Sequence, residues 1–188
     1  MPLRISFDLE DADLRHFETL ARETQDAARA RSAAQIVAAA RQVLERAERA
    51  QLAQFMRERF AGLRLMLEML ADDGWQLGEG DRQRVINALA CFAEAPRGDV
   101  PALQLLEHAI MIELVSRDLQ HDVAAYADFC RFRERHRAQR RPGTSEQAHA
   151  QTLENKRLAL QARMHERRLR DLDRAGGAVR RLFALFRL

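Results

Sequence analysis

The stretch Ala109-Ile110-Met111-Ile112-Glu113-Leu114-Val115 decides the fold of this chain of 188 residues. It is the most apolar segment, and no Gly or Pro interrupts the sequence around it from Ala102 to about Arg137. One helix over this range would be about 50 Å long, at a rise of 1.5 Å per residue. A helix break near Ser116-Arg117-Asp118 is the alternative. The stretch predicts a long core helix and indicates no particular chemistry.

The residues that follow extend the pattern of a buried helix. Leu119, Val123, Tyr126 and Cys130 fall at steps of four, three and four, which is the spacing of one helical face. The chain has only 8 Gly and 4 Pro, and good helix formers dominate its composition. The sequence therefore predicts an all-α fold, a bundle of about five helices with one long core helix and a basic C-terminal helical tail.

Four shorter helices are predicted before the core helix. They run from about residue 10 to 29, from Ser32 through Ala47, from Leu52 through Leu70, and from Gly80 through Phe92. Ser32-Ala33-Ala34-Gln35 fits a capping box, in which Ser and Gln bind each other's free amides at a helix start. Gly74 is expected to end the third helix in the left-handed conformation. In the fourth helix, Arg82 and Arg84 are expected to point outward. The alternating apolar residues of 3–9 predict an extended arm.

Charge is divided unevenly along the chain. Residues 1–130 hold 15 Lys and Arg against 22 Asp and Glu, a balance of −7. Residues 131–188 hold 16 against 6, a balance of +10. The strongest linker signal, Arg140-Arg141-Pro142-Gly143, lies near this boundary. The sequence therefore predicts a helical body over residues 1–138 and a basic helical tail over residues 139–188, an asymmetry that points to partners.

Cysteine usage and hydropathy narrow the class of protein further. Cys91 and Cys130 have no second cysteine near either, so no disulfide framework is predicted, and this usage suits a reducing compartment. The N-terminus reaches acidic residues before any apolar run of signal length. No stretch approaches the roughly 20 apolar residues that a membrane-spanning helix needs. We expect a cytoplasmic protein, with attachment to the inner face of the membrane as an alternative.

One segment carries a family resemblance. Its residues are Cys91-Phe92, Glu94-Ala95, Asp99-Val100-Pro101-Ala102-Leu103-Gln104 and Leu105-Leu106-Glu107-His108-Ala109-Ile110, followed by Glu113-Leu114-Val115 and by Asp118-Leu119 through Phe129-Cys130. Together they resemble the bacterial YkvA-like domain of unknown function, most specifically over about forty residues. The start of the chain, from Ile5 to Phe17, is similar to one branch of that family. The resemblance implies that Ala109 to Phe132 is the core helix of such a domain.

The chain departs from the family pattern in its acidic loop. The family's Asp-Pro pair is Glu94-Ala95 here, and its Leu-Ile-Pro-Asp element is missing. The turn Gly of the family is Gln104, and its Asp-Asp pair is Glu107-His108. The positions that match the family motif are Phe92, Glu94, Asp99, Pro101, Gln104, Glu107 and His108. The family has no established reaction, so the resemblance implies no catalytic residue.

Two groups of residues are candidates for a chemical site. Glu107 and His108, with Glu113 and Asp99, are weak candidates for metal ligands, but a carboxylate in the first turns of a helix is favourable without a metal. Cys91, Cys130 and His121 suggest a nucleophile, but both cysteines fall on apolar faces, where a thiol is usually inert. We therefore expect no cofactor, no metal and no catalytic residue, and we interpret the protein as a non-enzyme.

The basic tail is the strongest functional lead. Thr144-Ser145-Glu146-Gln147 fits a capping box that starts its helix. The chain ends with an amphipathic, basic segment whose candidate contact residues are Arg180, Arg181, Leu182, Phe183, Leu185, Phe186 and Arg187. Such a segment suits docking on protein, binding to a membrane surface, or phosphate contacts with nucleic acid. Interleaved aromatic residues for base stacking are lacking, which makes nucleic acid the weakest of the three.

These observations favour a helical interaction or regulatory module that binds a protein partner or a second copy of itself. A peripheral membrane protein held by its C-terminus is the first alternative. A remnant of a metal-dependent or catalytic site near Glu107 and His108 is the second. No feature of the sequence identifies a small-molecule substrate.

Overall fold

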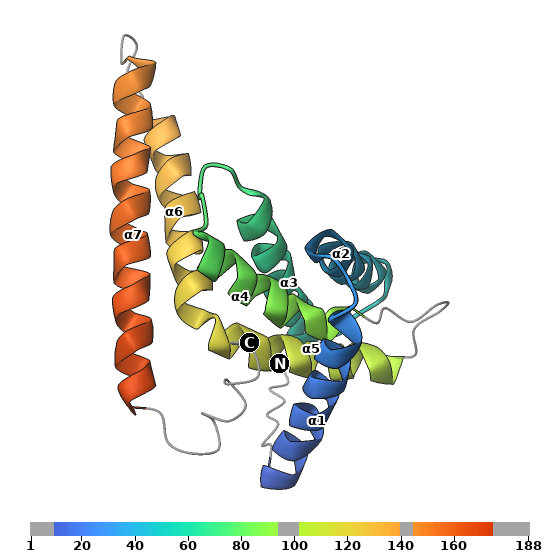
Figure 1. The fold of residues 1–188 in the computed structure, drawn as a ribbon. Helices are drawn as coiled ribbons and strands as arrows, with labels where there is room; N and C mark the ends of the chain where they lie inside the picture. Colours follow the sequence, from blue (N-terminus) through green and yellow to red (C-terminus); the bar gives the residue numbers. More distant parts are fainter. Residues whose placement is uncertain (1–9, 94–101, 140–144, 175–188) are drawn as a thin grey trace, which may run out of the picture.

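The structure is a computed structural model that describes residues 10–93, 102–139 and 145–174 (Figure 1). The described residues form seven α-helices and one short 3-10 helix, with no strand among them. The helices are α1 (Asp11–Ala28), α2 (Ala33–Arg49), α3 (Gln54–Ala71), α4 (Glu79–Leu89), η1 (Ala90–Phe92), α5 (Ala102–Asp118), α6 (Gln120–Ala138) and α7 (Glu146–Arg174). The predicted all-α fold is confirmed. The expected extended arm lies outside the described residues.

The start of α2 shows how closely the local sequence specifies these helices. The Ser32 hydroxyl accepts from the Gln35 backbone amide at 3.3 Å, and the Gln35 side chain accepts from the Ser32 amide at 2.8 Å. The predicted capping box is confirmed. The start of α7 differs by one residue from its prediction, because the Ser145 hydroxyl accepts from the Ala148 amide at 3.1 Å.

The predicted long core helix is two helices. The chain leaves helical geometry at Leu119, where φ is −93° and ψ is 15°, and α6 begins at the next residue. The two helices have different neighbours, since α5 packs mainly on α3 whereas α6 packs on both α3 and α7. Figure 1 shows that α6 turns away from the direction of α5. The prediction of a continuous helix is therefore wrong, and the alternative break is confirmed. Among the described residues, six α-helices precede the tail helix.

Helices α3 and α5 approach closely at the centre of the body. Gly62 of α3 permits this approach, because a Cβ atom there would lie 3.1 Å from the Ser116 hydroxyl of α5. Ile112, on the same side of α5, is fully buried. Aromatic packing extends the core toward α6, where the Trp75 ring centroid lies 5.2 Å from that of Phe129 and 5.8 Å from that of Tyr126.

The turn after α3 corrects one prediction. Gly74 does not adopt the left-handed conformation, and the residue that does is Gln76, with φ at 49°. Gly74 is needed for space, because its Cβ would lie about 3 Å from Asp72 and Arg133 side-chain atoms, at 3.1 and 3.2 Å. Asp72 organises the turn by accepting from the Gly74 amide at 2.9 Å and from the Tyr126 hydroxyl at 3.1 Å.

The predicted tail helix packs on the body. Helix α7 runs antiparallel along α6, at one side of the bundle (Figure 1). Leu160 and Met164, which are 3% and 1% exposed, join the hydrophobic core from one face of the helix. Leu158 and Leu169 stay 50% and 63% exposed. None of the described helices is both long enough and apolar enough to cross a membrane.

Candidate functional site

Of the motif positions whose side chains are described, Phe92 lies in the hydrophobic core, whereas Glu107 and His108 are half-buried. Phe92 is fully buried in η1, and its ring centroid lies 6.0 Å from that of His108 in α5, edge to face. Glu107 is half-buried beside it. Glu94, Asp99 and Pro101 lie outside the described residues, as does the side chain of Gln104. The structure therefore brings two of the motif positions, Phe92 and His108, into direct contact.

Burial determines the ionisation of the two candidate groups in this core. It lowers the pKa of His108 to about 4, and the nearby Arg46 adds to this effect. Burial also raises the pKa of the Cys91 thiol to about 12, against a hydrogen bond with Thr24 that lowers it. At neutral pH both side chains are uncharged. In the described part of the chain, no group of three or more His, Cys, Asp or Glu side chains could hold a metal ion.

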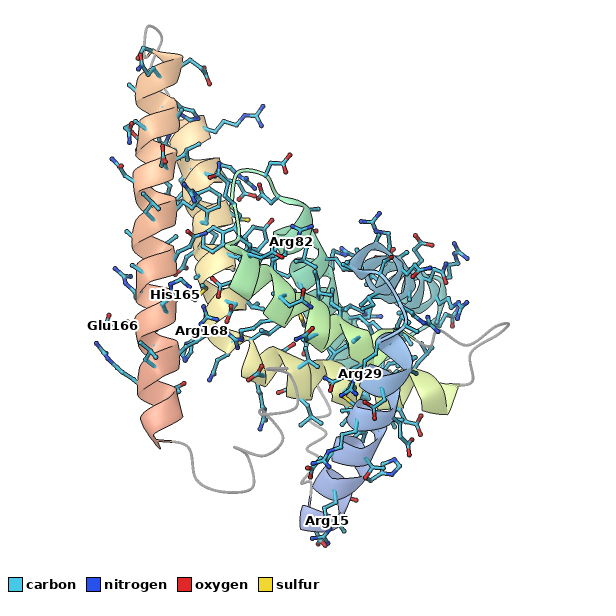
Figure 2. All side chains as sticks on the ribbon, viewed as in Figure 1. Arg15, Arg29, Arg82, His165, Glu166 and Arg168 are labelled. Atoms are coloured by element: carbon cyan, nitrogen blue, oxygen red, sulfur yellow. The ribbon has the colours of Figure 1, made fainter. Side chains whose placement is uncertain are left out.

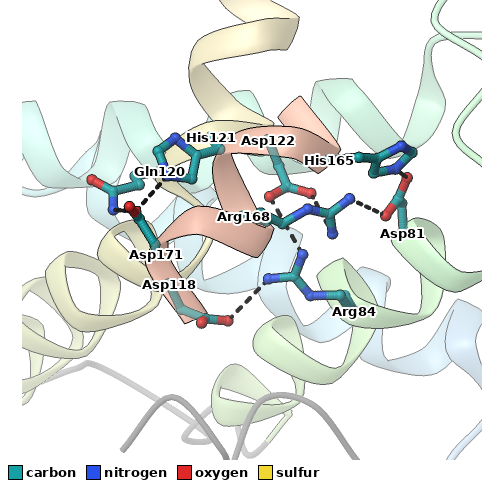
Figure 3. A network of polar contacts seen from close by, with 9 residues as sticks. All are labelled: Asp81, Arg84, Asp118, Gln120, His121, Asp122, His165, Arg168 and Asp171. Atoms are coloured by element: carbon teal, nitrogen blue, oxygen red, sulfur yellow. Dashed lines mark hydrogen bonds and ion pairs between the residues drawn. The ribbon is translucent and has the colours of Figure 1, made fainter. Parts of the chain in front are cut away.

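A network of polar contacts that was not predicted from the sequence joins α4, the α5–α6 break and α7 (Figure 3). Asp81 and Arg84 come from α4, Asp118 ends α5, Asp122 lies in the first turn of α6, and Arg168 comes from the last third of α7. We call these five residues the charge junction.

Asp122 is the centre of the charge junction. Its side chain is fully buried, with Arg168 at 3.5 Å and Arg84 at 3.6 Å from its carboxylate oxygens. Arg84 also lies 3.5 Å from Asp118. Burial raises the pKa of Asp122 to about 6, opposed by Arg84 and reinforced by the charges of Asp81 and Asp118. The junction thus holds three carboxylates close to two guanidinium groups.

Helix α7 supplies the outer half of this arrangement. Arg168 donates to the Asp81 carboxylate at 2.5 Å, and the His165 Nε2 lies 2.8 Å from the other oxygen of Asp81. One turn farther, Asp171 of α7 lies 2.6 Å from the His121 Nε2. Figure 2 shows His165 and Arg168 directed toward the body, whereas Glu166, between them in sequence, points away from it.

Polar contacts continue along α7 toward its N-terminal end. The Gln161 amide donates to the carbonyl oxygens of Trp75 at 2.8 Å and of Gln76 at 3.3 Å. Both carbonyls belong to the turn after α3. Helix α7 therefore supplies a hydrogen-bond donor to backbone acceptors of this turn. Nearer the N-terminus of α7, the Lys156 ammonium lies 5.2 Å from the Phe132 ring centroid of α6. We call Trp75, Gln76, Asp81, His121, Asp122 and Phe132 together the α7 docking surface.

One prediction about this region was wrong, and one was right. Arg82 is exposed as expected, but Arg84 points inward and its side chain is 18% exposed. The sequence contained a signal for this: Asp118 and Asp122 are four residues apart and flank Leu119 at the start of an apolar seam. Buried carboxylates on such a seam require cationic partners. The sequence does not show which arginine provides them.

The candidate contact residues Arg180 to Arg187 lie outside the described residues, so docking, membrane binding and nucleic-acid binding by that segment stay predictions. Comparison of the chain with protein-family models, with curated proteins and with solved structures finds no match. The resemblance to the YkvA-like family also stays a prediction.

Proposed function

We propose that this protein is a non-enzymatic helical interaction and regulatory module, whose α7 docking surface binds a basic amphipathic helix. In this structure α7 is the occupant of that surface. Helix α7 therefore controls access to the surface for any competing helix. This proposal follows the sequence-based expectation that the basic tail contacts protein.

The charge balance of the junction carries the proposal. With α7 in place, Asp81, Asp118 and Asp122 face the guanidinium groups of Arg84 and Arg168. Without α7, Arg84 would be the one guanidinium group of the charge junction that still faces the three carboxylates. Because a buried carboxylate without a cation is costly, the surface favours an occupant that brings a positive charge to this point.

The contacts of α7 also define the pattern that an occupant needs. Leu160 and Met164 are four residues apart and supply the buried apolar side chains. Arg168 follows after four more residues, so that all three lie on one face of a helix. Gln161 adds a donor for the carbonyls of Trp75 and Gln76. A partner helix with apolar, apolar and arginine residues at this spacing fits the same surface.

A peptide of residues 146–174 tests the proposal. The peptide is titrated by fluorescence anisotropy against the full chain carrying Arg168→Glu, in which the junction repels the chain's own α7. We expect clear binding, and binding weaker by about tenfold to the unsubstituted chain, whose surface is occupied; a factor of ten corresponds to 1.4 kcal/mol.

Matched peptides provide the controls. The same peptide with Arg168→Glu should bind about tenfold more weakly, whereas Arg167→Glu, at an exposed neighbouring position, should bind like the original. The proposed function is wrong if the original peptide fails to bind the full chain that carries Arg168→Glu. It is also wrong if the Arg168→Glu peptide binds that chain as tightly as the original peptide does.

A further inference from the structure

We infer that the basic helix that binds the α7 docking surface is the α7 of a second copy of this chain, so that two chains exchange α7 reciprocally. This inference rests on the proposed function and names its partner. The partner chain completes the charge junction, because its Arg168 takes the place of the chain's own. Exchange of an identical element between two copies is a low-cost route to a dimer.

The chemistry of α7 favours a second copy over a different protein. Three of its side chains, Gln161, His165 and Arg168, meet particular groups of the surface along about two turns of helix. Every copy of the chain carries these residues in the same register. An exchanged dimer therefore forms the same contacts as the single chain, and each junction keeps three carboxylates with two guanidinium groups.

The body keeps most of its core when α7 leaves. Among the described side chains of α7, only Arg157, Leu160 and Met164 are buried. The other large, fully buried side chains come from the body, with Trp75, Phe92 and Phe129 the largest. Association costs translational and rotational freedom, which the unchanged contacts do not offset, so the exchanged form is favoured by high protein concentration.

A charge-swap pair of full-length chains tests the exchange. The first chain carries Arg168→Asp and the second carries Asp81→Arg. Within either chain alone, α7 meets a like charge at the junction. In a mixed dimer, both contacts are matched: the native α7 of the second chain meets the native α4 of the first, and the substituted α7 meets the substituted α4. The substituted pair still contains one Arg and one Asp, so the two side chains together span the same distance as in the native pair.

Differently tagged chains are mixed in equal amounts and examined by co-purification and sedimentation velocity. We expect a heterodimer at least about tenfold more abundant than the dimer of either chain alone, which corresponds to 1.4 kcal/mol. Hydrogen exchange within α7 should slow in the mixture. Two monomers with unprotected α7 helices in the mixture would overturn the inference. If the peptide of residues 146–174 still binds the full chain that carries Arg168→Glu in that case, the proposed function remains supported.

Three controls keep the result interpretable. Arg167→Asp and Glu79→Arg place the same charges at exposed neighbouring positions and should give no more heterodimer than two differently tagged unsubstituted chains give. A single chain with both Arg168→Asp and Asp81→Arg should protect its α7, which shows that the new pair forms. If either single variant fails to fold, two differently tagged unsubstituted chains are co-expressed. Co-purification that an excess of the peptide of residues 146–174 abolishes supports the exchange, and the complete absence of mixed dimers at high concentration rejects it.

Discussion

Helices α2 and α7 are attached to the same body in opposite ways. Helix α2 has 17 residues and buries six apolar side chains, Ile36, Ala39, Ala40, Val43, Leu44 and Ala47. Helix α7 has 29 residues, and its buried side chains among those described are Arg157, Leu160 and Met164. Burial of apolar area stabilises in proportion to that area. Helix α2 is therefore a central part of the core, whereas α7 contributes two apolar side chains to it.

The difference extends to specificity. Apolar packing such as that of α2 depends on shape and volume and has little preference for charge. The contacts of α7 with Asp81, Asp122 and His121 need complementary groups at particular positions, and such contacts determine register and partner more than affinity. The proposed exchange of α7 depends on contacts of this kind.

The largest effect is expected in α2. Replacing Leu44 with Ala should lower the free energy of unfolding by about 2–5 kcal/mol, because it leaves a cavity in the core. Urea denaturation followed by circular dichroism measures this loss. Gln42→Ala, at an exposed position of the same helix, should change the free energy by no more than about 0.5 kcal/mol. Equal effects of the two substitutions would contradict the assignment of α2 to the core.

The features of α2 are those that a sequence shows well. Its capping box and apolar periodicity involve residues within a few positions of one another, so they were predicted correctly. The helix break at Leu119 was harder, because no Gly or Pro marks it and its cause is the packing of α5 and α6 on different neighbours. It was predicted as an alternative only.

The charge junction could not be predicted, because its pairs are far apart in the sequence. Arg168 and Asp81 are separated by 87 positions, and an arginine on a helix is expected to face solvent unless a partner is known. Arg84 was assigned outward for this reason. The pair Asp118 and Asp122 was the one local sign that cations had to come from elsewhere in the fold.

An intermediate effect is expected from the pH dependence of the junction. The pKa of Asp122 rises from 3.8 to about 6 in the folded protein, so the folded state binds the proton more tightly than the unfolded chain does. The stability gained from protonation is complete below about pH 3.8 and is lost as the pH rises through about 6. Between pH 5 and pH 7 the protein should lose about 1 kcal/mol relative to the Asp122→Asn variant.

Urea denaturation of both proteins at a series of pH values measures this difference. All other residues are the same in the two proteins, so the comparison isolates Asp122. Asp128→Asn, in the same helix with a side chain 47% exposed, is the matched control and should show the pH dependence of the unsubstituted protein. If the free energy of unfolding of Asp122→Asn changes with pH in parallel with that of the unsubstituted protein, the two guanidinium groups offset the burial of the ionised Asp122 carboxylate completely.

The smallest effect is expected on the outer face of α7. Arg170 pairs with Glu166, and both side chains are 60% exposed, whereas Arg168, two positions earlier, has a side chain 15% exposed and contacts the body. Arg170→Ala should change hydrogen exchange in α7 by no more than about 0.5 kcal/mol of opening free energy, because exposed pairs on a helix contribute little. Arg168→Ala, which leaves Asp122 with one guanidinium, should cost about 1–3 kcal/mol. Equal effects of Arg170→Ala and Arg168→Ala would mean that apolar contacts alone hold α7 on the body. Helices α2 and α7 would then differ only in how much apolar surface each buries.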